Sequence, residues 1–183
     1  MRLTVYTDYT LRVMIYLSLK YKDGGVATID EMARAYGISR SHLTKIVNEL
    51  SQSGFIETLR GRAGGARLAR APDRISLGEV VRMAEKDFAV VECQDGALES
   101  DCAVFRACNL KRGLHRAVSA FMQELDKMTF EDAVSAPALA ASLLGLGEPV
   151  AVPLPPRGSS RKPAPAQPLH EPAPRRRAAT NVQ

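Results

Sequence analysis

Three cysteines are the residues of this chain best suited to chemistry. Cys93, Cys102 and Cys108 follow the spacing C-x8-C-x5-C. Structural zinc sites usually have closely spaced cysteine pairs and four ligands, so this pattern disfavours zinc. Iron–sulfur clusters accept longer and less regular spacings, and a ligand other than cysteine can hold one iron. The spacing therefore favours an iron–sulfur cluster with three thiolates and one weaker ligand.

Two other interpretations of the cysteines stay open. Buried thiols can serve as small apolar residues, but the segment between Cys93 and Cys102 is rich in Gly, Asp, Glu and Ser and is a poor place to bury them. Exposed thiols can form a redox switch, in which disulfides or sulfenic acids change DNA binding without iron. An odd number of cysteines argues against a disulfide framework of the secreted type.

The segment 28–51 predicts a helix-turn-helix. Thr28 and Glu31 have the spacing of a capping box, which opens a short helix. A sharp turn containing glycine follows at 36–39. Ser39 is a good N-cap for the second helix, which runs to the end of the segment.

The second helix of this motif has one apolar and one polar face. Its apolar residues recur at intervals of three and four positions and are predicted to pack inward: Leu43, Ile46, Val47 and Leu50. The candidate DNA-contacting residues occupy the other sides: Arg40, Ser41, His42, Thr44, Lys45 and Asn48. A face that is merely solvated usually mixes both charge signs, whereas this one has no acid before Glu49. The pattern is typical of a recognition helix that touches base edges.

A small basic hairpin is predicted directly after this helix. Residues 57–60 and 66–68 favour strands, and the glycines of 61–65 favour a turn. Three arginines are expected to project from its tip toward a minor groove or along phosphates: Arg60, Arg62 and Arg67. A helix-turn-helix followed by such a hairpin predicts a winged helix.

Longer helices are predicted on both sides of the winged helix. Residues 8–21 form the first, Ser76 and Glu79 have the capping-box spacing that opens a helix through about Lys86, and a long helix begins near Cys108. The long helix carries an apolar stripe: Leu110, Leu114, Ala117, Val118, Phe121, Leu125 and Met128. The stripe suits a dimer interface but equally suits a core within one chain. The predicted fold is mainly α with a small β-hairpin, a winged helix-turn-helix plus a long dimerisation helix.

Composition and charge fit this fold. The 183 residues are 45% hydrophobic and 25% charged, as in a single globular domain, and the net charge is +5. Residues 34–74 hold eight basic side chains against three acidic ones, which favours a polyanionic partner. Residues 75–147 hold seven against eleven.

The predicted organisation has four parts. They are a DNA-binding domain at 1–88, a cluster-binding loop at 89–108, the dimerisation helix with short C-terminal helices at 109–147, and a disordered Pro/Arg-rich tail at 148–183. The tail holds nine of the eleven prolines and a run of three arginines, so we expect it to be solvated, with non-specific phosphate contacts as the alternative.

Several function classes are disfavoured by the sequence. It has no phosphate-binding G-x-x-x-x-G-K-[ST] loop, no H-E-x-x-H motif and no Ser/His/Asp set, so we expect no enzyme. No apolar stretch of the expected folded region is long enough for a membrane span, and no signal peptide is recognisable. We therefore expect a cytoplasmic protein that does not contact the membrane.

Residues 1 to about 134 resemble bacterial winged-helix transcription regulators that carry iron–sulfur clusters, in particular the nitric-oxide-sensing repressors. The likeness rests on residues 1–9, 36–43 and 60–65, and on the three cysteines that precede Leu110-Lys111. It implies a homodimer that binds double-stranded operator DNA and holds a 4Fe-4S or 2Fe-2S cluster. The implied ligands are Cys93, Cys102, Cys108 and Asp8, with Asp8 reaching over from the partner subunit.

The resemblance also implies a mechanism. Nitric oxide attacks the cluster, helped by the carboxylate of Asp8, which binds iron more weakly than a thiolate does. Cluster loss then changes the separation of the two recognition helices and relieves repression. Asp8 also suits a plain role as a first-turn acid at the positive end of a helix.

Two positions bear on the branch of the family. Lys111 stands where relatives that monitor cluster assembly have a histidine, which speaks against that branch. The eight residues between Cys93 and Cys102 are closer to the spacing of iron-responsive relatives. An iron-responsive regulator therefore remains the alternative to a nitric-oxide sensor.

Overall fold

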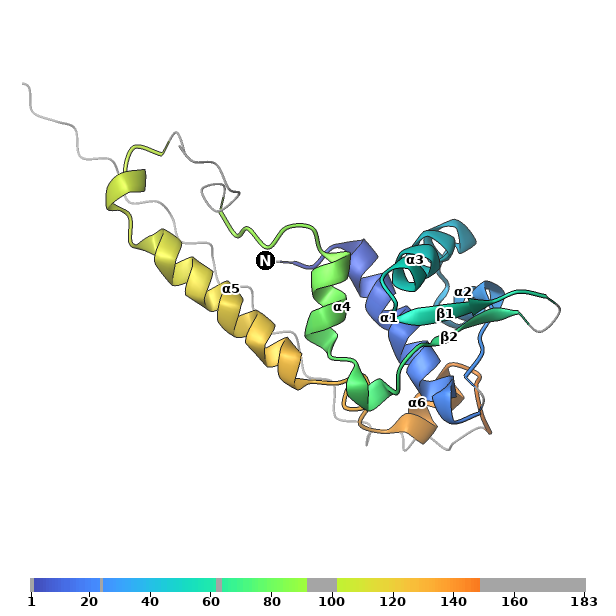
Figure 1. The fold of residues 1–183 in the computed structure, drawn as a ribbon. Coiled ribbons are helices and arrows are strands. Elements are labelled where there is room, and N and C mark those ends of the chain that lie inside the picture. Colours follow the sequence, from blue (N-terminus) through green and yellow to red (C-terminus); the bar gives the residue numbers. More distant parts are fainter. Residues whose placement is uncertain (1, 24, 62–63, 92–101, 149–183) are drawn as a thin grey trace, which may run out of the picture. The chain divides into compact units, whose positions relative to one another are not determined.

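The computed structural model describes residues 2–23, 25–61, 64–91 and 102–148, all within the first of two units, Met1–Val150. The elements in chain order are α1 (Val5–Lys20), the 3-10 turn η1 (Tyr21–Asp23), α2 (Ile29–Tyr36), α3 (Arg40–Gln52), β1 (Ile56–Leu59), β2 (Gly65–Leu68), η2 (Pro72–Arg74), α4 (Leu77–Ala84), η4 (Phe105–Ala107), α5 (Leu110–Lys127) and α6 (Pro137–Leu143) (Figure 1). The prediction of a mainly helical fold with one small β-hairpin is confirmed.

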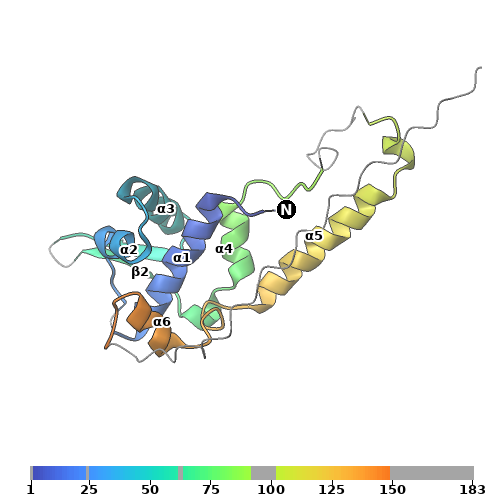
Figure 2. The same cartoon turned by 180° about the vertical axis from the view of Figure 1, so that it is seen from behind.

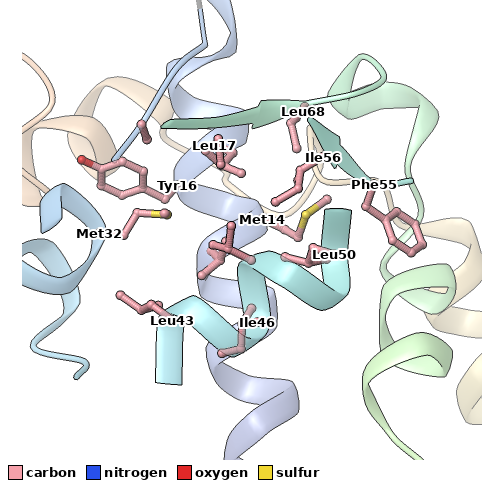
Figure 3. Packing of buried hydrophobic residues seen from close by; sticks show 14 of the residues in the cluster. Met14, Tyr16, Leu17, Met32, Leu43, Ile46, Leu50, Phe55, Ile56 and Leu68 are labelled. Atoms are coloured by element: carbon pink, nitrogen blue, oxygen red, sulfur yellow. The ribbon is translucent and has the colours of Figure 1, made fainter. Parts of the chain in front are cut away.

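Helix α1 lies at the centre of the core. Val13, Met14 and Leu17 are fully buried, and α1 packs against α2, α3, α4, α6 and β2. Figure 3 shows where the apolar face of α3 meets α1: Leu43, Ile46 and Leu50. The predicted inward face of α3 is confirmed, because all four of its apolar residues are buried. This shared core sets the orientation of α3 on α1.

The helix-turn-helix forms where the sequence predicts it. The Thr28 N–H donates to the Glu31 carboxylate at 2.6 Å and the Glu31 N–H donates to the Thr28 hydroxyl at 3.2 Å, which confirms the capping box. Gly37 ends α2 with a φ of 65°, in the left-handed region that favours glycine. Ser39 occupies the N-cap position of α3, but its hydroxyl lies 3.2 Å from that of Ser41 and makes no capping bond.

The wing is the antiparallel hairpin of strands β1 and β2, in which Ile56 pairs with Leu68 and Leu59 pairs with Gly65. Ala27 joins it as a single bridge, exchanging backbone hydrogen bonds of 2.9 and 2.8 Å with Ala66. A Cβ at Gly65 would lie 2.5 Å from the Ala27 carbonyl oxygen, so this approach needs glycine. The bridge fixes the base of the wing to the segment that precedes α2.

Helix α4 connects α1 to α5, and both views show it between them (Figure 2). Its predicted capping box is confirmed, since Ser76 and Glu79 bond reciprocally at 2.9 and 3.1 Å. The helix ends at Ala84, two residues earlier than predicted, because Glu85 adopts an extended conformation. Arg82 binds Asp126 of α5 at 2.5 and 2.6 Å. These contacts fasten the C-terminal half of α5 to α4.

The apolar stripe of α5 is only partly covered in the single chain. Met122 is the one buried residue of this helix, whereas Leu110 is 63% exposed and Met128, just after the helix, is 38% exposed. After α5 the chain returns to pair with the segment before α4, and Phe130 there is only 1% exposed. Within the described residues, the single chain therefore leaves Leu110, Ala117 and Met128 exposed and the other stripe residues partly buried.

Several predictions lie outside the described residues. They concern Cys93, Arg62 and the tail beyond residue 148. The boundaries of the four predicted parts stay predictions. In the described part of the chain, no helix is long and apolar enough to cross a membrane.

The turn between α2 and α3 gives a stability prediction. Gly37→Ala should lower the free energy of unfolding by about 1 kcal/mol, because a Cβ strains the left-handed backbone. No atom lies within 4 Å of a Cβ built there, so conformation and not crowding sets the cost. Gly37→Asn is the control. Its free energy of unfolding should fall less, since Asn tolerates the left-handed backbone region. Urea unfolding measures both, and an equal loss in the two variants would contradict the argument.

Candidate functional site

The polar face of α3 is open to solvent. All six predicted DNA-contacting residues of this helix are exposed: Arg40, Ser41, His42, Thr44, Lys45 and Asn48. Some are already engaged, since Arg40 pairs with Asp30 of α2 at 2.9 Å and the Thr44 hydroxyl donates to the Arg40 carbonyl at 2.8 Å. Lys45 and Asn48 have no hydrogen bond or ion pair within the described residues. They are the donors freest to meet DNA.

Two tyrosines of α1 contact α3, and sequence reasoning missed both contacts. The Tyr9 and His42 rings lie 6.1 Å apart, and the Tyr6 hydroxyl donates to the Glu49 carboxylate. Burial and this hydrogen bond raise the pKa of Tyr6 far above its ordinary value, so the phenol is a neutral donor. Tyr6 and Tyr9 are three residues apart, a spacing that puts them on one helical surface and could have marked them in the sequence.

The wing presents fewer free arginines than predicted. Arg60 is exposed just after β1, and Arg62 lies outside the described residues. Arg67 lies within β2 directly opposite Glu57, and its guanidinium binds that carboxylate at 3.0 and 2.8 Å. The expectation that all three arginines project from the tip is therefore wrong for Arg67, because the strand register places it beside an acid.

Asp8 lies in the first turn of α1 and is about half exposed. Arg12, one turn later, holds its carboxylate with Nε contacts of 3.1 Å to both oxygens. This hydrogen bond raises the pKa of the Arg12 guanidinium, which also lies 5.9 Å from the centre of the Tyr36 ring beside the Gly37 turn. Asp8 is thus an accessible carboxylate that must share or leave Arg12 to bind a metal.

Two of the three cysteines are described. Cys102 is exposed and Cys108 is half-buried, and no disulfide joins them. The turn η4 separates them, with Phe105 donating its N–H to the Cys102 carbonyl at 2.9 Å and Lys111 lying 4.5 Å over the Phe105 ring. In the described ranges, no three His, Cys, Asp or Glu side chains gather to hold a metal ion. Asp8 therefore does not complete a site with Cys102 and Cys108 in one chain.

These donors suit an iron–sulfur cluster. Cysteines that are not joined in a disulfide, on an irregular loop, can become the thiolate ligands that such clusters require. A surface carboxylate can supply the hard fourth ligand if it comes from another subunit. Lys111 presents no ring nitrogen for iron, and its ammonium lies on the Phe105 ring instead.

Glu85 ties the start of α1 to the end of α4. One carboxylate oxygen accepts hydrogen bonds from the Thr4 N–H at 2.9 Å, the Thr4 hydroxyl at 3.1 Å and the Thr7 hydroxyl at 2.7 Å. Partial burial raises the pKa of Glu85, but these hydrogen bonds outweigh burial and leave it below the ordinary value. Asp8 follows Thr7 directly, so Glu85 fixes the turn that carries the candidate ligand. No local pattern in the sequence predicted this long-range contact.

Comparison with known proteins identifies the chain's relatives. Residues 3–136 match the Rrf2 family, described as iron-dependent transcriptional regulators. The HTH-type transcriptional regulator NsrR of Bacillus subtilis is 46% identical over 134 residues, which cover 73% of this chain and 90% of that protein. The NsrR of Bacillus licheniformis is 44% identical, with 73% and 92% covered.

Solved structures agree with this fold. CymR of B. subtilis, a global cysteine regulator, is 28% identical with a TM-score of 0.59, and the match covers 74% of this chain and 97% of that one. IscR of T. potens has a TM-score of 0.57 at 23% identity, covering 73% and 85%. At that identity the likeness shows the fold alone.

The Glu85 anchor gives a pH-dependent prediction. Glu85→Gln should lower the free energy of unfolding by about 1 kcal/mol at neutral pH, because an amide oxygen accepts these bonds more weakly than a carboxylate. The hydrogen bonds lower the folded pKa, so the stabilisation is complete above the unfolded pKa and is lost as the pH falls through the folded value. The difference between the two proteins should therefore shrink below about pH 4 in urea unfolding. A difference that grows on acidification would contradict the assignment.

Proposed function

The chain belongs to the Rrf2 family of transcription regulators, and we propose that it is a dimeric repressor that senses nitric oxide through an iron–sulfur cluster. The observation that carries the proposal is the donor set of Cys93, Cys102, Cys108 and Asp8 on a winged-helix chain whose relatives are NsrR regulators. When bound, the iron–sulfur cluster would supply iron atoms that nitric oxide can attack.

Operator binding is assigned to α3 and the wing. Lys45 and Asn48 are exposed donors without a partner in the described residues, and Arg60 follows β1 on the open wing. Base edges are read by donors near the start of a recognition helix, while lysines and arginines set affinity through phosphates. On DNA binding, Arg40 and Arg67 would leave their acidic partners for phosphates. This exchange costs little free energy, because exposed ion pairs contribute little to stability.

Dimerisation is assigned to α5. The exposed Leu110 and Met128 lie at the two ends of a stripe that one chain covers only in part. A helix face of this kind is stabilised when a second copy buries it. Palindromic sites also require two recognition helices about one turn of DNA apart, which a dimer supplies.

The role assigned to Asp8 is that of an exchangeable ligand. Arg12 binds the Asp8 carboxylate in the single chain, so the chain itself offers Asp8 an alternative partner. A carboxylate is also a weaker ligand than thiolate for iron. Release of Asp8 would therefore leave no buried unpaired charge.

Iron is the second candidate signal. The family is described as iron-dependent, and the long spacing between Cys93 and Cys102 suits the iron-responsive branch. In this case cluster occupancy would follow iron supply and not nitric oxide.

The cluster is tested by anaerobic visible absorption with iron and sulfide analysis. Wild-type protein should be coloured and should bleach when nitric oxide is added, with parallel loss of operator binding. Cys102→Ala should be colourless and derepressed, because it removes one thiolate ligand. His115→Ala, an exposed residue of α5, is the control and should keep the colour.

Three outcomes would contradict the proposed signal. A cluster that ignores nitric oxide but is lost to an iron chelator would favour the iron-responsive function. A colourless wild-type protein with three titratable thiols would favour a thiol redox switch. Unchanged repression by Cys102→Ala would remove the cluster from regulation.

DNA recognition is tested by salt dependence. Lys45→Ala should weaken operator binding and reduce the slope of log affinity against log salt by about 1, because one phosphate contact is lost. Lys127→Ala in the last turn of α5 is the control and should leave the slope unchanged. Fluorescence anisotropy measures both, and equal slopes for wild type and Lys45→Ala would contradict the role of Lys45.

A further inference from the structure

Glu49 is the one acidic residue of α3. Its carboxylate would repel phosphates if it faced DNA. Instead, the Glu49 carboxylate accepts a hydrogen bond from the Tyr6 hydroxyl of α1, and both residues are partly buried. An acid on a recognition helix is thus held by a partner on another helix.

Lys45 stands four residues before Glu49, one helical turn away. Side chains at this spacing are neighbours on a helix surface, and opposite charges there form ion pairs. Yet Lys45 is exposed and makes no ion pair in the described part of the chain. The acid that could neutralise it is bound by Tyr6.

We propose that Tyr6 is a positioning residue that holds Glu49 on α1 and so leaves Lys45 free to contact a DNA phosphate. The inference rests on the proposed DNA-binding role of α3. Tyr6 also precedes the candidate ligand Asp8 by two residues in the first turns of α1.

Losing the Tyr6 hydroxyl has two electrostatic effects on DNA binding. Glu49 becomes free to pair with Lys45, which removes a phosphate contact. The released carboxylate, no longer held against α1, can also repel the phosphates of DNA bound by α3. Both effects weaken binding, and the first also lowers its salt dependence.

Tyr9 provides a matched control on the same surface of α1. It contacts His42 through its ring, and its hydroxyl has no hydrogen bond among the described residues. Tyr9→Phe therefore removes a phenol oxygen next to α3 without releasing an acid. Tyr6→Phe removes one that holds Glu49.

The test uses full-length protein purified anaerobically, with variants matched in iron content and visible spectrum. The probe is a short fluorescent duplex that the wild-type protein selects from a random-sequence pool. Tyr6→Phe should bind it roughly 3- to 10-fold more weakly, with a salt slope reduced by about 1. Tyr6→Phe/Glu49→Gln should regain most of the affinity, because no charge remains to pair Lys45, and Tyr9→Phe should match wild type.

The double variant separates charge from structure. Wild-type affinity in Tyr6→Phe would overturn the inference, as would a double variant that stays as weak as Tyr6→Phe, since the loss would then be structural. Both results leave the proposed function intact, because wild-type protein still binds the duplex. If the wild type selects no duplex, the DNA-binding function fails and this inference falls with it.

Discussion

The burial of α1 is the constraint on which the rest of the structure depends. Val13, Met14 and Leu17 are fully buried among α3 and its neighbours, so the second half of this helix cannot move without opening the core. Its first turns carry polar contacts instead. Thr7 donates a hydrogen bond to Glu85 and Tyr6 donates one to Glu49, so α1 joins the end of α4 to α3. These hydrogen bonds can change partners more easily than the buried apolar contacts can rearrange.

Ion pairing divides the basic residues of the proposed DNA-binding surface into two groups. Arg40 and Arg67 are held by Asp30 and Glu57 in exposed pairs, which fix their direction but contribute little stability. Lys45 has no such partner in the described residues. The net basic charge of 34–74 therefore overstates how many of these cations are unpaired.

The sequence predicted features that depend on local chemistry. Both capping boxes, the inward face of α3 and the hairpin follow from spacings of two to four residues, and the structure confirms them. The contact of Tyr6 with Glu49 spans 43 residues and that of Thr7 with Glu85 spans 78, so only the folded core brings them together. Arg67 was misplaced because the register of a hairpin, which sets Glu57 opposite it, depends on the turn.

A second copy of the chain would complete two features that the single chain leaves incomplete, the apolar stripe of α5 and the proposed ligand set. The stripe of α5 leaves Leu110 and Met128 exposed, and Asp8 forms no three-ligand group with Cys102 and Cys108 among the described residues. A second copy that buries α5 also brings a second Asp8. If dimerisation completes the proposed ligand set in this way, cluster binding would depend on the position of α1, which also holds the acid of α3. The helix proposed to read the operator and the proposed fourth ligand would then both depend on α1.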